Sequence, residues 1–90
     1  MTIVRRQKRG EILYGNWQMR GNFIYQRLGE KIFTRRKKKG LSQEDLSILS
    51  DVDRTYIGRV EQGKTNPSFR TLVKLSRALK VKLSELLRGV

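Results

Sequence analysis

The central segment of this 90-residue chain, residues 41–68, predicts two short helices that meet at a sharp angle. Ser42 stands three residues before Asp45, which is the spacing of a capping box at a helix start. Asp53 likewise stands at the start of a second helical segment, which carries the apolar residues Ile57 and Val60. Gly63 then supplies a stop signal, because glycine readily adopts the left-handed backbone that ends a helix. A segment with two helix starts so close together predicts a helix–turn–helix arrangement.

The second of these helices has a polar outer face without a carboxylate. Arg54, Thr55, Tyr56 and Arg59 offer hydrogen-bond donors suited to phosphates and to base edges. For Tyr56 two roles stay open, a contact to a phosphate or thymine methyl and a partly buried position at the flank of the helix.

The whole chain is strongly basic. Its 21 Lys and Arg against 8 Asp and Glu give a formal net charge of +13, which suits a polyanionic partner. Most of the excess lies in residues 1–39, outside the two central helices.

The segment resembles the helix-turn-helix of the Cro and lambda-repressor (XRE) family. Gln43 matches the glutamine that begins the first of the two helices, and Ile57 matches the core position of the second. Further matches are Glu61–Lys64 and Asn66–Ser68, and the resemblance runs from about Leu28 to Leu87. The run from Arg54 is similar to the Arg-Thr-Tyr-Ile-Ser of restriction–modification controller proteins, with Gly58 in place of the serine.

The resemblance implies an all-α, five-helix, lambda-repressor-like DNA-binding domain over residues 23–90. It places Arg36 opposite Glu61 as a partly buried ion pair between the first and third helices. It also implies two sets of DNA contacts. The predicted base contacts are Arg54, Thr55 and Arg59. The predicted backbone contacts are Gln43, Tyr56, Lys64, Asn66 and Ser68.

Periodicity places the other helices. Apolar residues four apart predict a first helix from about Ile24 to Lys39. Its basic last turn has two interpretations, a solvated end that complements the helix dipole and a phosphate contact. Ser68 caps a fourth helix that ends near Lys80, with Leu72, Leu75 and Leu79 facing the core. A short fifth helix follows at about 83–87.

Residues 1–22 form a basic extension, in which Gly10, Gly15 and Gly21 argue against a helix. Three roles are open for it: a flexible tail, a basic arm on DNA, and a structured contact to a dimer mate.

The C-terminal end holds a larger number of apolar residues than one small core needs, namely Leu83, Leu86, Leu87 and Val90, and the candidates for a pairing surface are Leu83, Leu87 and Val90. They either cap the core or form the interface of a homodimer.

The composition argues against several other classes of protein. Without Cys or His the chain lacks the usual thiolate ligands and the commonest general base. No apolar run approaches the roughly 20 residues of a membrane span. We expect no secretory signal, because no apolar run follows the basic residues near the N-terminus. We therefore expect no catalytic residues, no metal, no cofactor and no small-molecule effector domain, and we expect a cytoplasmic, nucleoid-associated protein.

These observations predict a transcriptional regulator that binds a near-palindromic operator in double-stranded DNA as a homodimer, and the resemblance favours a restriction–modification controller. One rival is an antitoxin-like protein whose main partner is another protein. The other is a non-specific RNA-binding protein, although RNA recognition usually uses aromatic residues on a sheet or loop.

Overall fold

The structure, a computed structural model, describes the backbone of residues 15–90 and the side chains of residues 23–90. This part of the chain contains helices and connecting loops only, so the predicted all-α, five-helix class is confirmed. Residues 1–14 of the basic extension, and with them the test of its three open roles, lie outside the described residues. The helices are α1 (Gly15–Lys38), α2 (Gln43–Ser50), α3 (Arg54–Glu61), α4 (Phe69–Leu79) and α5 (Leu83–Leu87).

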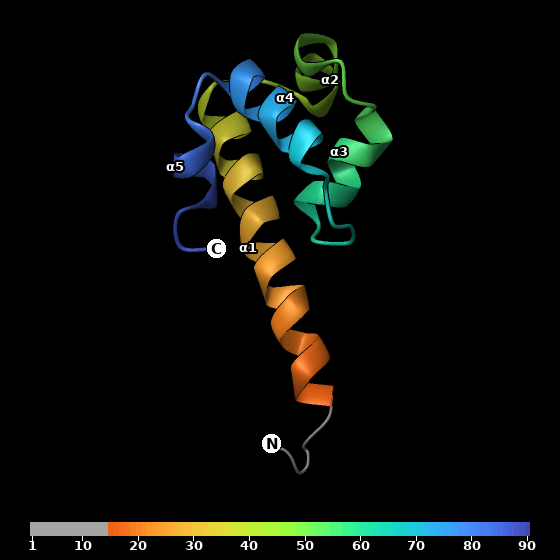
Figure 1. The fold of residues 1–90 in the computed structure, drawn as a ribbon. Helices are drawn as coiled ribbons and strands as arrows, with labels where there is room; N and C mark the ends of the chain where they lie inside the picture. The colour runs from red at the N-terminus through yellow and green to blue at the C-terminus, as the bar shows by residue number, and fades with distance from the viewer. Residues whose placement is uncertain (1–14) are drawn as a thin grey trace.

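The start of α1 differs from the prediction. The helix begins at Gly15 rather than Ile24, so the expectation that glycines exclude a helix was wrong for residues 15–22. A glycine costs only about 1 kcal/mol in a helix. Extending an existing helix is much easier than nucleating one. The helix that forms in the periodic segment after Ile24 can therefore extend towards the N-terminus through the glycines. At 1.5 Å per residue α1 is about 36 Å long, and its first half extends beyond the other helices (Figure 1).

The predicted helix starts are confirmed atom by atom. In α2, Ser42 accepts a hydrogen bond from the Asp45 N–H at 2.9 Å, and Asp45 accepts one from the Ser42 N–H at 2.9 Å. Asp53 caps α3 and Ser68 caps α4 through their side chains. These caps fix where each helix enters the domain.

Residues with a left-handed backbone follow four of the helices, α1 to α4. Gly40 after α1 and Gly63 after α3 have φ of 71° and 73°, which for Gly63 agrees with the predicted stop signal. Asp51 after α2 and Lys80 after α4 adopt the same conformation, with φ of 61° and 58°. Non-glycine residues rarely take this conformation, although Asp tolerates it better than most.

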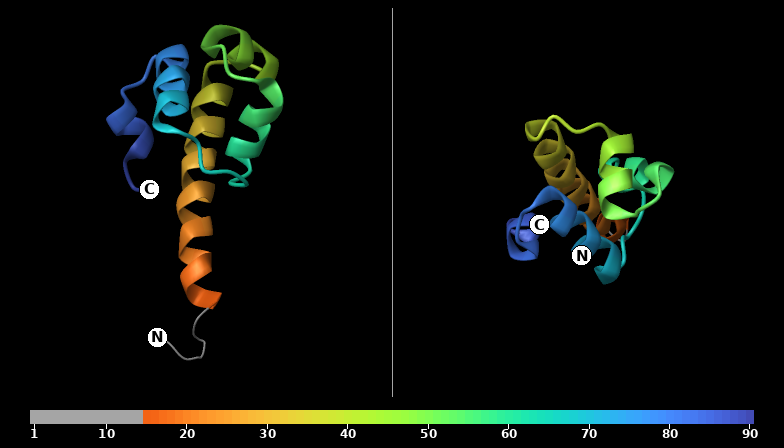
Figure 2. Two further views of the ribbon diagram at one scale, coloured as in Figure 1. Left: turned by 45° about the vertical axis from the view of Figure 1, so that its right-hand side comes forward. Right: turned by 90° about the horizontal axis from the view of Figure 1, so that it is seen from above.

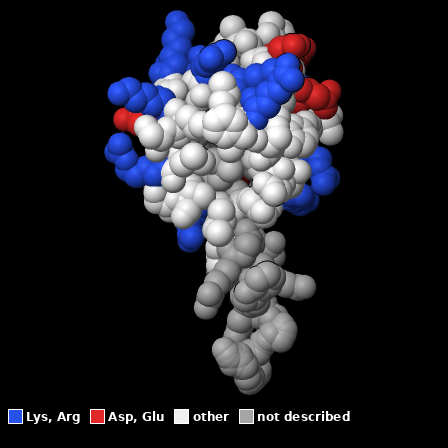
Figure 3. Space-filling view, viewed as in Figure 1, with Lys and Arg blue, Asp and Glu red and all other residues white. Residues whose placement is uncertain are grey.

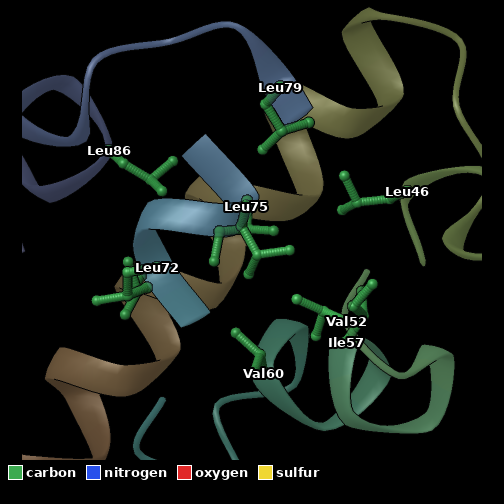
Figure 4. Close-up of a cluster of buried hydrophobic side chains, with 10 residues drawn as sticks. Leu46, Val52, Ile57, Val60, Leu72, Leu75, Leu79 and Leu86 are labelled. Carbon is green, nitrogen blue, oxygen red and sulfur yellow. The ribbon is translucent and has the colours of Figure 1, made fainter. Parts of the chain in front are cut away.

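A single apolar core lies where the helices converge (Figure 4). The predicted core residues of α4 are all buried. The fully enclosed side chains are Ile32, Leu46, Ile57, Val60, Leu75, Leu79 and Leu86.

The inward face of α2 is narrower than its sequence suggests. Leu46 is buried, but Leu49, the next leucine of α2, is 59% exposed. Ser50, one turn after Leu46, takes the inward position instead, and its hydroxyl donates to the Leu46 carbonyl at 2.6 Å. That local bond lets a serine be buried without leaving a polar group unsatisfied.

The helices are arranged around α1. In Figures 1 and 2, α2 and α3 lie on one side of α1 and α5 on the other, while α4 crosses between them. The crossing of α1 with α3 is close because of Gly29: a Cβ added there would lie only 2.3 Å from the Val60 carbonyl oxygen. This close crossing sets the position of α3, whose outer face faces solvent.

Candidate nucleic-acid interface

The outer face of α3 presents the three residues predicted to contact bases. Arg54, Thr55 and Arg59 are all exposed, while Ile57 and Val60 on the opposite face are fully buried. The structure therefore brings the predicted base-contacting residues together on one solvent-facing surface of a helix held by the core.

Tyr56 lies at the flank of this face. It is half-buried and packs against the core, and its backbone N–H donates to the Asp53 carboxylate at 3.2 Å. The packing role considered for Tyr56 is thus present, and its contact to DNA stays a prediction.

A buried ion pair joins α1 to the end of α3, as the resemblance implied. The Arg36 Nε donates to Glu61 Oε2 at 2.6 Å, and Nη2 donates to Glu61 Oε1 at 3.0 Å. The two side chains are only 7% and 4% exposed. The remaining guanidinium nitrogen, Nη1, donates to the Leu41 carbonyl at 2.8 Å, and the group lies 5.2 Å from the centre of the Phe33 ring. These bonds satisfy a charge that would be costly to bury alone.

Gln43 is tied into the same network. Its Nε2 donates to Glu61 Oε1 at 3.0 Å, so one of its two amide hydrogens is committed inside the protein. The other hydrogen and the Oε1 atom are left for an outside partner. Eighteen residues separate Gln43 from Glu61, and no local spacing in the sequence signalled this bond.

The predicted backbone contacts after α3 lie in the loop to α4. Lys64 and Asn66 are exposed, and Arg59 Nη2 donates to the Lys64 carbonyl at 3.4 Å, across the turn at Gly63. Ser68 is exposed too, but its hydroxyl is engaged in capping: it accepts from the Thr71 N–H at 3.1 Å and donates to Thr71 Oγ1 at 2.9 Å.

Two open hollows flank α3. The first, of about 500 Å³, lies between the end of α1 and the start of α2, beside Arg54 and Lys37. The second, of about 510 Å³, lies between α1 and the loop after α3, beside Tyr25 and Lys64. Lys37 belongs to the basic last turn of α1, for which a phosphate contact was one of the two interpretations considered. Tyr25 was not predicted near the interface, and the crossing of α1 with α3 places it there.

Other charged side chains make local bonds or join α1 to α5. Asp45 is fully exposed, and hydrogen bonds from the backbone and side chain of Ser42 lower the pKa of its carboxyl group. On the other side of α1, Arg35 pairs with Glu85 at 3.2 Å, and Lys31 donates to the Glu85 carbonyl at 3.1 Å. These contacts fasten α5 to α1 at a distance from α3.

The C-terminal residues divide between core and surface. Leu86 is fully buried and Leu87 is 40% exposed. Leu83 and Val90 are half-buried and pack against the core.

No helix in residues 15–90, the part that the structure describes, has the length and apolar character to cross a membrane.

Known proteins share this arrangement. A helix-turn-helix family model matches residues 32–86. The chain belongs to this helix-turn-helix (XRE) family. Control protein C.MunI of Mycoplasma sp is 43% identical over 70 residues, which cover 77% of this chain and 95% of that protein. Its other relatives include HTH-type transcriptional regulators, among them SlrR of Bacillus subtilis.

Two solved structures of restriction–modification controller proteins have the same fold. C.AhdI from Aeromonas hydrophila matches with a TM-score of 0.68 and 42% identity, over 69% of this chain and 94% of that chain. The C.Esp1396I tetramer in complex with its natural 35 base-pair operator matches with a TM-score of 0.67 and 32% identity, over 72% of this chain and 90% of that chain.

Proposed function

We propose that this chain is a sequence-specific regulator of transcription that binds a near-palindromic operator in double-stranded DNA as a homodimer, in the manner of a restriction–modification controller. The observation that carries the proposal is the exposed, carboxylate-free outer face of α3, which is held in place by the core and by the Arg36–Glu61 pair. The proposal assigns the chain no catalytic activity, and we expect it to act in the cytoplasm, at the nucleoid.

In this proposal α3 enters the major groove. Arg54 and Arg59 then face base edges, where an arginine most often pairs with guanine O6 and N7, so we expect guanine in each half-site. Gln43, at the start of α2, donates its free amide hydrogen to a phosphate on one side of the groove. Lys64 and Asn66 contact the backbone on the other side.

The specificity test begins with selection of an operator from a random library of duplex DNA. Replacing Arg54 or Arg59 with alanine should cost about 1–3 kcal/mol on that operator and relax selectivity at one or two positions. Gln43→Ala should weaken operator and random DNA in similar proportion, because a phosphate contact carries no sequence information. An equal loss on both kinds of DNA for the arginine variants would contradict the base-contact assignment.

The dimer is proposed from the C-terminal surface. In Figure 3 the middle of the view is largely uncharged, and the Lys, Arg, Asp and Glu side chains lie mostly around it. Leu87 is exposed, and Leu83 and Val90 are partly accessible on α5 and just after it. Two-fold pairing would place two α3 helices about 34–36 Å apart on one face of the DNA, which is one helical turn.

Leu87→Glu tests this interface. Because Leu87 is outside the core, the variant should keep its circular dichroism spectrum while dimerisation and operator affinity fall together. Leu86→Glu is the matched comparison, since Leu86 is fully buried and its variant should unfold. A folded Leu87→Glu variant that still sediments as a dimer would place the interface elsewhere.

The rival functions are less favoured. The relatives are controller proteins and transcriptional regulators, which argues against an antitoxin-like protein whose main partner is a toxin. Competition between duplex DNA and structured RNA separates the proposal from non-specific RNA binding. Only a regulator of the proposed kind should keep its operator when RNA is in excess.

A further inference from the structure

Gly58 interrupts the outer face of α3 with a position that has no side chain. Helix periodicity places it on one face with Thr55 and Gln62, three and four residues away. Apart from chain neighbours, a Cβ added at Gly58 would find its nearest atoms at 3.6–3.9 Å, and all of them belong to the Gln43 amide. The half-buried glycine therefore leaves a shallow recess, with the backbone of α3 as its floor and Gln43 as one wall.

The wall of this recess is fixed. The Gln43 amide donates to Glu61, and Glu61 is held in turn by Arg36. Gln43 would have to give up its 3.0 Å bond to Glu61 in order to fold over Gly58 and fill the space. The recess is thus a built part of the surface that faces DNA in the proposed function.

Packing within the protein does not account for the glycine. A glycine inside a helix destabilises that helix relative to alanine. At Gly29 this cost has a clear reason, because a Cβ there would lie 2.3 Å from backbone oxygen. At Gly58 an alanine would make only ordinary contacts. The other common use of glycine is to let a ligand approach the backbone closely.

The chemistry of the recess indicates which group would enter it. The Gly58 carbonyl already accepts the Gln62 N–H at 3.1 Å within the helix, so the floor is mainly the apolar Cα. Among the groups on the major-groove edges of the bases, the C5 methyl of thymine is the apolar one. Resting on the proposed function, we infer that Gly58 is a specificity-determining position that seats a thymine C5 methyl group in each half-site.

The test pairs a methyl group on the protein with a methyl group on the DNA. After operator selection with the full chain, deoxyuridine replaces thymine at the equivalent position of both half-sites, one position at a time, which removes only the C5 methyl groups. Binding is measured by fluorescence anisotropy for the parent protein and for Gly58→Ala. For the parent, replacement at the sensitive position should weaken binding roughly fourfold for each methyl group removed, the value of one buried methyl group.

Gly58→Ala should bind the thymine operator roughly tenfold more weakly than the parent, because two methyl groups then compete for one recess. On the deoxyuridine operator most of this loss should disappear. Gln62→Ala is a control on the same face. Its loss of affinity should be the same on the thymine operator and on the deoxyuridine operator. Circular dichroism and urea unfolding establish that Gly58→Ala is folded, and we expect it to be more stable than the parent.

The outcomes separate the inference from the proposed function. If selection enriches no sequence, the proposed function fails and the inference falls with it. If an operator is enriched but Gly58→Ala binds it as tightly as the parent does, the inference alone is overturned. It is also overturned if Gly58→Ala loses the same factor on the thymine and deoxyuridine operators.

Discussion

Replacing Gly29 with alanine would place a methyl group between α1 and the last turn of α3. The added Cβ would lie 2.3 Å from the Val60 carbonyl oxygen and 2.6 Å from the Glu61 carbonyl oxygen. Both atoms are backbone, so no side-chain rotation relieves the overlap, and the two helices have to move apart. Glu61 is the ion-pair partner of the buried Arg36, so the same movement also strains that ion pair.

The expected size of the effect follows from two opposing contributions. Alanine in a helix interior stabilises by about 0.5–1 kcal/mol relative to glycine. Overpacking a close-packed interior costs about 1–3 kcal/mol and occasionally more. Because the overlap at Gly29 is with rigid backbone, we expect overpacking to exceed the helix gain, with a net loss of about 1–3 kcal/mol.

Gly58→Ala is the matched control for this prediction, since it makes the same substitution in a helix with room for the methyl group. It should gain about 0.5–1 kcal/mol. Urea unfolding followed by circular dichroism measures both variants under the same conditions. A Gly29→Ala protein as stable as the parent would refute the argument that the close crossing requires glycine.

Three further predictions concern stability. Glu61→Ala should destabilise by about 3–5 kcal/mol, because it leaves the buried Arg36 without its partner; unchanged urea unfolding would contradict this. Leu75→Ala should cost about 2–5 kcal/mol by opening a cavity in the core, again measured by urea unfolding. The lowered pKa of Asp45 means that its contribution is present above the usual value of 3.8 and is lost as the pH falls through the lowered folded value. Asp45→Asn should therefore flatten the acid limb of the stability profile, and an unchanged limb would count against the capping box with Ser42.

Much of the fold could be predicted from the sequence because its signals are local. The caps at Ser42, Asp53 and Ser68 and the stop at Gly63 each depend on a few neighbouring residues. The beginning of α1 was predicted wrongly because the low helix propensity of glycine is a weak local signal. Extension of a helix that has already formed can overcome the cost of these glycines.

The site was predictable only in part. Exposed donors on α3 follow from periodicity, and the Arg36–Glu61 pair followed from the resemblance to a family. The bond from Gln43 to Glu61 depends on how α2 and α3 meet, which no spacing along the chain encodes. The sequence also could not show that Gly29 and Gly58 are glycines for different reasons, because only the atoms around them in the fold distinguish the two positions.

The network around Arg36 has a consequence for genetics. One guanidinium holds the turn at Leu41 and the end of α3, and through Glu61 it holds the Gln43 amide. A genetic screen for loss of operator binding should therefore recover changes in α1 at positions that never touch DNA. Suppressors of such changes should cluster where α1 crosses α3, rather than on the outer face of α3.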